Sequence, residues 1–399
     1  MTHILYISYD GMLEPLGQSQ VLAYLKRLAN GRRIHLISFE KADDWANVAE
    51  RVRLARDIAS AGIAWHPLRY HKTPSVLATA FDIMQGIIVG VWLCVRYKIK
   101  IIHARSYIPS VIALTLKKLF NVKYIFDMRG FWADERIDGG LWPKGGRIYR
   151  VAKWFEKRFL LSADSVVSLT NAAVDEMKKF DYLQGRLPNF KVITTCTDLN
   201  LFDFKKTNIN NSSKESFVVG YVGSVGVWYL FDETLNCFKL ILEKVPSAQL
   251  HIINRGGHQY IRERLIDKRI NPNKVMIETS DHAGVAKAMQ SMDVGIFFIK
   301  PVYSKMSSAP TKLGEFLGCG IPCLSNTKVG DMAVILNDEK VGVALDSFDE
   351  TSMKLGIEEL MTLLNDPEIR ERCRSTALKY FSLDIGVRSY NHIYNRLIS

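Results

Sequence analysis

The sequence predicts an α/β protein built from two doubly wound domains in tandem. Short β-rich runs alternate with helical stretches along the chain, a pattern typical of parallel sheets that helices cover on both faces. The length of 399 residues is enough for two domains with separate hydrophobic cores. A polar segment near the middle, residues 205–216, separates the two alternating halves.

The first half contains seven predicted strands. Apolar residues at helical spacing predict helices between them, for example over residues 20–29 and 111–119. The predicted strands cover residues 4–8, 34–39, 63–68, 101–103, 124–127, 165–169 and 192–195. Strands connected by helices in this way form βαβ units, so we expect a parallel sheet.

The alternation starts again after the polar segment. Six further strands are predicted there, over residues 218–222, 249–253, 275–278, 294–299, 322–324 and 343–345. We therefore place an N-terminal domain at residues 1–204, a linker at 205–216 and a C-terminal domain at 217–380. Residues 381–399 are expected to form a helix that packs back on the N-terminal domain.

Positive charge is concentrated in the first half. Residues 1–200 contain 29 basic and 18 acidic residues, a net charge of +11, whereas residues 201–399 have a net charge of +1. An anionic partner is therefore expected on the N-terminal domain. No nucleic-acid-binding motif accompanies this charge, so we do not expect nucleic acid to be that partner.

The composition fits a protein of the reducing cytosol. Six scattered cysteines show neither a metal-binding nor a disulfide spacing, and the N-terminus lacks the pattern of a secretory signal. Residues 76–95 are mostly apolar, but Asp82 and Gln85 lie near their middle. Because an Asp at the bilayer centre is costly, the pattern favours a buried core helix over one that touches a membrane.

Glycine turns follow the first predicted strand of each domain, at the edge where parallel sheets bind ligands. The first turn leads to Gly17, and the second contains Gly223, Ser224 and Gly226. Such a turn before a helix favours an anion, although glycine at these positions can also serve packing alone. Neither a G-x-G-x-x-G dinucleotide motif nor a P-loop is present.

Lys312 and Glu315 are predicted to share one face of a helix start. Pro310 and Thr311 favour the beginning of that helix, and Gly318 favours its end. A Lys ammonium can hold a diphosphate, and a carboxylate can accept the two hydroxyls of a ribose. The alternative for residues at this spacing is a solvent-exposed ion pair.

These features together resemble the retaining glycosyltransferases of family 4, which have the GT-B fold. The similarity extends over nearly the whole chain and includes Gly17, the strand end at 101–106, the segments 162–170 and 192–198, Gly223 and the stretch 312–322. The resemblance implies that the C-terminal domain binds a nucleotide sugar, UDP- or GDP-linked, and that the N-terminal domain binds the acceptor. It places Glu315 on the ribose and Lys312 near the diphosphate, with Gly17, Gly223 and Ser224 as further nucleotide-sugar contacts.

The sequence departs from the family pattern at two places in the C-terminal domain. The family usually has two glutamates separated by seven residues, and Ser307 stands where the first would be. An Arg that often follows the glycine turn is also missing. Arg255, Lys300 or Lys305 could supply its charge, and Arg255 is favoured because it directly follows a predicted strand.

Charged and aromatic side chains crowd the segment directly after the strand at 124–127. Asp127 stands at about the position where the family often has a His. Asp127 and Arg129 could bind sugar hydroxyls or take the proton of the acceptor, or they could form an internal ion pair. Trp132 could stack on a sugar ring, and Glu135 is a second candidate for binding the acceptor.

Residues 144–160 predict a basic amphipathic helix. Apolar residues recur there at helical spacing, and the segment contains six basic residues and a single acidic one, Glu156. This pattern suits a helix that lies on an anionic membrane surface, and it equally suits a core-packed helix with a solvated basic face.

The resemblance implies a glycosyltransferase that extends a lipid-linked glycan or a cell-surface polysaccharide precursor, with retention, as a cytoplasmic protein in peripheral contact with the membrane. Asp127, Arg129 and Lys312 are the catalytic candidates, and Lys312 would stabilise the departing diphosphate. No metal or other cofactor is expected, and no D-x-D triplet is present. A sugar-nucleotide epimerase of the same architecture and a catalytically silent transferase-like subunit remain alternatives.

Overall fold

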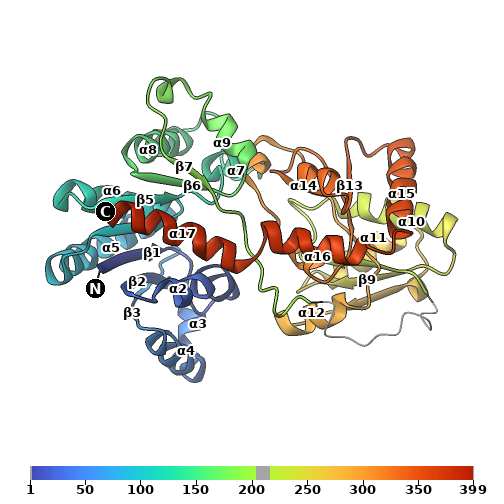
Figure 1. Ribbon diagram of the computed structural model, residues 1–399, viewed down its shortest axis with the longest axis horizontal. Coiled ribbons are helices and arrows are strands. Elements are labelled where there is room, and N and C mark those ends of the chain that lie inside the picture. The colour runs from blue at the N-terminus through green and yellow to red at the C-terminus, as the bar shows by residue number, and fades with distance from the viewer. Residues whose placement is uncertain (1, 204–215, 399) are drawn as a thin grey trace. The chain divides into compact units, whose positions relative to one another are not determined.

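The computed structural model describes residues 2–203 and 216–398, and it confirms two parallel-sheet α/β units (Figure 1). Unit 1 comprises Met1–Thr194 and Leu383–Ser399, and unit 2 comprises Thr195–Ser382. The predicted linker at 205–216 lies outside the described residues except for Ser216.

Unit 1 contains a seven-stranded parallel sheet with the order β3-β2-β1-β4-β5-β6-β7. Its strands are β1 (Thr2–Ser8), β2 (Arg32–Glu40), β3 (Ile63–Arg69), β4 (Ile101–Arg105), β5 (Lys123–Asp127), β6 (Ser165–Ser168) and β7 (Phe190–Val192). Six of the seven predicted strands coincide with these strands, whereas the strand predicted over 192–195 shares only Val192 with β7. The order reverses between β1 and β4, so the loops after these two strands lie at the switch point where such sheets bind ligands.

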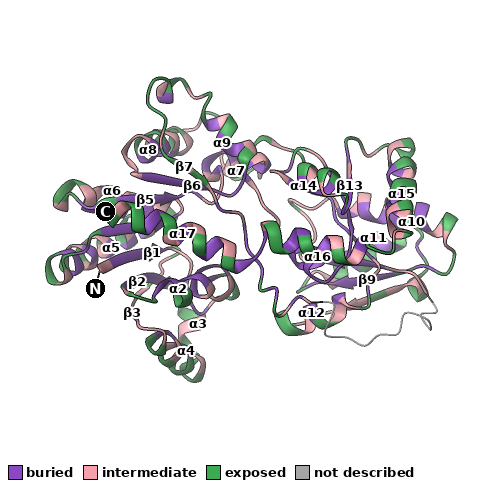
Figure 2. Cartoon of the chain, in the orientation of Figure 1, coloured by how far each residue is buried: buried purple, intermediate pink, exposed green. Residues whose placement is uncertain are grey.

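Helices surround the sheet of unit 1, and the strands between them are buried (Figure 2). The helices are α1 (Pro15–Gly17), α2 (Ala23–Leu28), α3 (Ala42–Ala46), α4 (Val48–Ser60), α5 (Ser75–Tyr97), α6 (Tyr107–Phe120), α7 (Trp132–Asp138), α8 (Arg147–Ser162), α9 (Asn171–Met177) and α17 (Leu383–Ile398). α5 packs on α6, and α6 packs on α8. The last helix, α17, returns to unit 1 and packs against α2 and β4.

Unit 2 repeats the architecture with a six-stranded parallel sheet of order β10-β9-β8-β11-β12-β13. Its strands are β8 (Val218–Val222), β9 (Gln249–Ile253), β10 (Val275–Glu278), β11 (Val294–Ile296), β12 (Cys323–Asn326) and β13 (Gly342–Leu345). Its helices are α10 (Phe231–Lys244), α11 (His258–Asp267), α12 (His282–Met289), α13 (Thr311–Gly318), α14 (Met332–Asp338), α15 (Glu350–Leu364) and α16 (Ile369–Tyr380). α13 begins and ends as the prolines and glycines around it predict.

The apolar segment at 76–95 forms most of α5, and the expectation of a buried core helix is wrong for the outer face of this helix. α5 buries a narrow face of small or polar residues that includes Ala78, Asp82, Gly86 and Gly90. Its opposite face is apolar and exposed. The sequence pattern gives the apolar character of the helix but not which of its faces the sheet covers.

Three histidines form a ladder across neighbouring strands of unit 1. His3 on β1 lies 3.0 Å from His35 on β2, and His35 lies 3.3 Å from His66 on β3, as measured between ring nitrogens. The rings of successive histidines are stacked. Burial, together with the charges of His66 and His3, lowers the pKa of His35 to about 4.

The histidine ladder predicts acid-sensitive stability. The pKa of His35 is lower in the folded state than the unfolded value of 6.5, so its neutral form stabilises the fold above pH 6.5. This contribution is lost as the pH falls from 6.5 towards 4, and it amounts to about 2 kcal/mol between pH 7 and pH 5. Urea unfolding of His35→Phe should show a correspondingly weaker loss over this interval. The exposed His392 supplies the control, because His392→Phe should keep the wild-type acid dependence.

Candidate functional site

The glycine turn after β1 is packed closely and already holds an internal carboxylate. The amides of Met12 and Leu13 donate to the buried carboxylate of Glu40, at 2.8 and 3.2 Å. A Cβ atom on Gly17 would lie 2.0 Å from the carbonyl oxygen of Gly11, so only glycine fits there. The anion that this turn attracts is thus a side chain of unit 1 itself, and Gly17 has a steric role.

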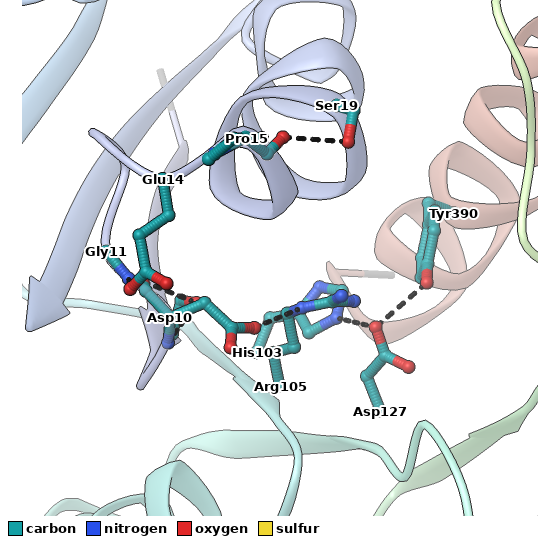
Figure 3. A network of polar contacts seen from close by, with 10 residues as sticks. Asp10, Gly11, Glu14, Pro15, Ser19, His103, Arg105, Asp127 and Tyr390 are labelled. Carbon is teal, nitrogen blue, oxygen red and sulfur yellow. Dashed lines mark hydrogen bonds and ion pairs between the residues drawn. The ribbon is translucent and has the colours of Figure 1, made fainter. Parts of the chain in front are cut away.

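Asp127 lies at the end of β5, at the centre of a buried polar network (Figure 3). The Tyr390 hydroxyl, from α17, donates to Oδ2 of Asp127 at 2.9 Å. His103, in the middle of β4, has Nε2 at 3.5 Å from the same oxygen, and its Nδ1 is hydrogen-bonded to the Tyr394 hydroxyl at 2.7 Å. The second oxygen, Oδ1, is buried without a hydrogen-bond partner.

The electrostatics keep Asp127 ionised. Burial alone would raise the pKa of Asp127, but the charge of Arg129 and the contact with His103 outweigh it, and with Arg105 they hold this pKa at about 2. Burial lowers the pKa of His103, so its imidazole is neutral at pH 7. A carboxylate with so low a pKa is a weak general base at neutral pH. It is better suited to accepting a hydrogen bond or to stabilising positive charge.

The other predicted residues of unit 1 follow Asp127 in the chain, in the loop after β5 and on α7. Arg129 has a left-handed backbone conformation with φ of 60°, and Gly130 follows it. The Trp132 ring lies 5.4 Å from the Tyr107 ring and 5.1 Å from the Trp142 ring, between ring centroids, and the Arg136 guanidinium lies over it at 5.3 Å. Trp132 is therefore already held by side chains of unit 1. Glu135 lies half-buried on α7, one turn from Trp132.

Unit 2 also has a glycine turn after its first strand, and Asn254 ties this turn to the neighbouring loop. The Asn254 side chain donates to the Gly223 carbonyl at 2.8 Å and accepts from the Gly257 amide at 2.6 Å. Gly223 and Gly226 have φ of 118° and 84°, values that residues other than glycine rarely adopt. Ser224 is exposed on the turn. The turn is thus open on one side and fixed by Asn254 on the other.

Lys312 points into this turn from α13. Its Nζ lies 2.7 Å from the position that a Cβ on Gly223 would occupy, and 3.9 Å from the centroid of the Tyr229 ring. The rings of Tyr221 and Phe297 also lie within 5.3 Å of Nζ. Nζ is buried and has no hydrogen-bond partner. Burial lowers the pKa of Lys312 to about 7, against the opposing charge of Glu315.

Glu315 lies one turn further along α13 and is nearly buried. His282, at the start of α12, approaches it with Nε2 at 3.4 Å from Oε1. The hydrogen bond that His282 donates to Glu315 raises the pKa of His282, as does the negative charge of this carboxylate. The exposed-ion-pair alternative for Lys312 and Glu315 does not describe this arrangement, because both side chains are buried and neither pairs with the other.

The candidates for additional positive charge differ in position. Arg255 is exposed directly after β9, next to Asn254. Lys305 is buried, with Nζ 3.8 Å from the centroid of the Trp228 ring, whereas Lys300 is exposed. Ser307 is buried and its hydroxyl donates to the Ser304 carbonyl at 2.7 Å, so it contributes no charge.

The sequence reasoning missed several residues of both sites. Tyr390 and Tyr394 contact β4 and β5 residues from more than 260 positions away in the chain. Their spacing of four residues, on one face of a helix, was the available signal. Asn254 and Tyr229 gave no signal of their own, because a single Asn or Tyr after a strand is common in loops.

Within the described ranges, no group of three or more His, Cys, Asp or Glu side chains is arranged to hold a metal ion.

Two family models match the chain. The model described as "Glycosyl transferase 4-like domain" matches residues 20–186, and the model described as "Glycosyl transferases group 1" matches residues 203–380. Together they cover most of the sequence, one in each unit. Among curated protein sequences, none is significantly similar to the chain.

Many solved structures share this fold at low sequence identity. A glycosyltransferase from Rickettsia africae is 14% identical with a TM-score of 0.74, and the alignment covers 100% of this chain and 99% of that one. Anabaena HepE, solved with UDP and glucose, is 14% identical with a TM-score of 0.67, covering 99% and 100%. WaaG, a glycosyltransferase involved in lipopolysaccharide biosynthesis, is 14% identical with a TM-score of 0.62, covering 96% and 98%.

Proposed function

This chain belongs to the GT-B glycosyltransferases, and we propose that it moves a sugar from a nucleotide-sugar donor bound to unit 2 to an acceptor bound to unit 1. The enzyme class follows from the two family models, which describe glycosyl transferases in both units. The donor class is supported by HepE, a structure of the same fold solved with UDP and glucose.

The buried Lys312 ammonium at the glycine turn is the observation that carries the proposal for the donor. A buried cation without a hydrogen-bond partner is costly, and a diphosphate at the turn would supply both charge and acceptor oxygens. The lack of a side chain on Gly223 lets Nζ approach the backbone of the turn closely, and Ser224 is exposed on the same turn. We assign the stabilisation of the leaving diphosphate to Lys312, supported by backbone amides of the turn and by Arg255.

Glu315 is proposed to bind the ribose. Its carboxylate lies one helical turn from Lys312, and a carboxylate can accept hydrogen bonds from two neighbouring hydroxyls. His282, which hydrogen-bonds Oε1, would hold the carboxylate in position for this role.

In unit 1, Asp127 and Arg129 are proposed to act at the transferred sugar or the acceptor, with Trp132 and Glu135 as neighbouring acceptor contacts. The pKa of about 2 favours Asp127 as a permanent negative charge that stabilises positive charge on the sugar, rather than as a base. An inverting displacement by a hydroxyl normally needs a base whose pKa lies near the working pH. We therefore propose transfer with retention, as in the family 4 enzymes. We also propose transfer without a metal ion, because Lys312 and the amides of the glycine turn would neutralise the leaving diphosphate.

Thermal-shift measurements with UDP, GDP and dTDP test the donor assignment, because a ligand that binds only the folded state raises the melting temperature. We expect UDP or GDP to do so, and the corresponding nucleotide sugar to be consumed only with an acceptor. Consumption of the donor without an acceptor, with formation of a second sugar nucleotide, would identify an epimerase instead. The anomeric configuration of the product, read by NMR, tests retention.

The proposed acceptor is a lipid-linked glycan or polysaccharide precursor at the cytoplasmic face of a membrane. The positive charge of residues 1–200 supports it, because such acceptors and their membranes are anionic. The predicted basic helix corresponds to α8. It buries Ala152, Glu156, Phe159 and Leu160, and it exposes apolar residues together with Arg147, Arg150 and Lys157. α8 is thus packed on one side and has an exposed basic face on the other, and this face supports the proposed contact with an anionic membrane.

Reversing the charge of α8 tests its role at the membrane. Each basic residue near an anionic surface contributes about 1 kcal/mol, and salt screens this attraction. The triple variant Arg147→Glu, Arg150→Glu and Lys157→Glu should therefore lose most of its low-salt co-sedimentation with anionic vesicles. Turnover with a soluble acceptor should not change. Unchanged sedimentation of the variant, or equal binding of the wild type to neutral vesicles, would reject α8 as an electrostatic anchor.

A further inference from the structure

We infer that the outer face of α5 docks on a lipid bilayer that contains anionic lipids, with the helix axis in the plane of the interface. The inference deepens the proposed function and rests on it, because it names the surface that would bring unit 1 to a lipid-linked acceptor. Its apolar contacts come from α5 alone, whereas the contribution proposed for α8 is electrostatic.

The outer face of α5 is an uninterrupted row of large apolar side chains. Six of them are between 43% and 69% exposed, and their spacing of three or four residues places them on one side of the helix: Leu77, Phe81, Met84, Ile88, Trp92 and Val95. The row extends over about 27 Å, at about 1.5 Å per residue. Single exposed apolar residues are normal, but a continuous row of this length marks a surface that another apolar medium covers.

The inner face of α5 argues against a membrane-spanning orientation. α5 has the length and apolar composition of a candidate span. Its buried Asp82, however, accepts a hydrogen bond from the Tyr9 hydroxyl at 2.8 Å and lies 2.6 Å from His71 Nδ1. A Cβ on Gly86 or Gly90 would lie within 2.6 Å of Ile112 or Leu116 of α6, so these helices are in close contact. Spanning would separate them and expose Asp82 to lipid, whereas docking in the interface leaves every one of these contacts intact.

The positive charge beside the apolar row favours a bilayer over a second copy of the chain as the partner that covers this row. α6 packs between α5 and α8, so these three helices form one layer of unit 1. Exposed basic residues accompany the apolar row on this layer, among them Arg96 on α5, Lys118 on α6 and Arg150 on α8. A two-fold dimer through this layer would bring two such basic surfaces together, which is unfavourable. Anionic headgroups complement it, and the acyl region accepts the apolar side chains.

The position of α5 in the fold links this surface to the acceptor side of unit 1. β3 ends at Arg69 and α5 begins at Ser75, so the N-terminal end of the apolar row lies near the carboxyl edge of the sheet. Asp127 ends β5 at the same edge. A bilayer along α5 would therefore hold the lipid of an acceptor beside the edge at which the glycan is expected to bind.

Single labelled cysteines test the orientation directly. All six native cysteines are buried, so an environment-sensitive fluorophore should react selectively with Leu77→Cys, Ile88→Cys or Val95→Cys. On vesicles of phosphatidylcholine with about 30% phosphatidylglycerol, we expect a blue shift at all three positions, and depth-dependent quenchers should place them at similar depths. Depths that change steadily from position 77 to 95 would indicate a span. A shift that depends on protein concentration and needs no vesicles would indicate a second copy; either result, or no shift, overturns the proposal.

A loss-of-binding variant supplies the second measurement. Leu77→Gln, Met84→Gln and Ile88→Gln together should reduce the vesicle partition coefficient by about tenfold or more, and mainly the part that resists high salt. The matched control changes three equally exposed apolar residues of unit 2, Ile266→Gln, Val334→Gln and Leu355→Gln, and should keep wild-type binding. Equal losses in the two variants would contradict the proposal. Thermal shifts with UDP and GDP are measured in parallel. If neither nucleotide raises the melting temperature, the donor assignment is rejected, whereas a shift without vesicle binding rejects only the docking surface.

Discussion

Lys312→Met should abolish sugar transfer and at the same time make the protein more stable. Met keeps most of the volume of the lysine side chain but removes its charge. If Nζ stabilises the leaving diphosphate, kcat should fall by about 10³-fold, the scale of losing one essential electrostatic contact in a buried site. Steady-state kinetics with the identified donor measures this loss, and Glu315→Ala should lose turnover as well because the ribose contact is removed.

The gain in stability follows from the burial of Lys312. Because its pKa in the folded state is about 7 instead of 10.5, the charged form is disfavoured by folding. This penalty is fully present below pH 7 and decreases as the pH rises towards 10.5. Lys312→Met should therefore exceed the wild type in unfolding free energy most clearly at or below pH 7. The exposed Lys287 provides a control, since Lys287→Met should change neither turnover nor stability appreciably.

The same lysine should couple nucleotide binding to proton uptake. A diphosphate beside Nζ would raise the pKa of Lys312, so UDP affinity should fall as the pH rises above about 7. Calorimetry in two buffers of different ionisation enthalpy would detect the proton taken up by the wild type and its absence in Lys312→Met. If the variant retained full turnover, or if proton uptake were the same in both proteins, Lys312 would not be the diphosphate residue.

The architecture could be predicted because its causes are local. Twelve of the thirteen predicted strands coincide with observed strands, and the one predicted over 192–195 overlaps β7 only at its first residue. Alternation of β-rich runs with helices determines a doubly wound sheet before any tertiary contact is known. The shared face of Lys312 and Glu315 on α13 was predictable for the same reason. Proline and glycine set the ends of the helix, and the spacing of three residues places both side chains on one face.

The parts that could not be predicted depend on contacts between distant segments. The carboxylate in the first glycine turn comes from Glu40, on the next strand, and the hydroxyl on Asp127 comes from Tyr390, in the last helix. Neither pairing follows from spacing, because the sheet order and the return of α17 decide it. The exposed face of α5 is a similar case: composition shows an apolar helix, but only packing shows that its glycine face is the one turned inward.

Asp127→Asn should reduce kcat by about 100-fold while leaving UDP affinity nearly unchanged. The carboxylate belongs to unit 1, whereas the nucleotide contacts are proposed on unit 2, so only a step that involves the sugar or the acceptor should suffer. Arg129→Ala should act in the same direction, because its charge helps to keep Asp127 ionised. Turnover at saturating donor, compared with the UDP thermal shift, measures the two quantities separately.

Stability measurements and a second variant distinguish a loss of catalysis in Asp127→Asn from general misfolding. Because its pKa is lowered from 3.8 to about 2, Asp127 contributes about 2 kcal/mol of stability above pH 3.8, and this is lost as the pH falls towards 2. Asp127→Asn should therefore be less stable than the wild type at pH 7 by about this amount, with a smaller difference at pH 3. Tyr390→Phe removes one hydrogen bond but keeps the charge, so its kcat should fall less than that of Asp127→Asn. If Asp127→Asn lost UDP affinity and turnover to the same extent, general misfolding would explain both, and the assignment of Asp127 to the transfer step would be wrong.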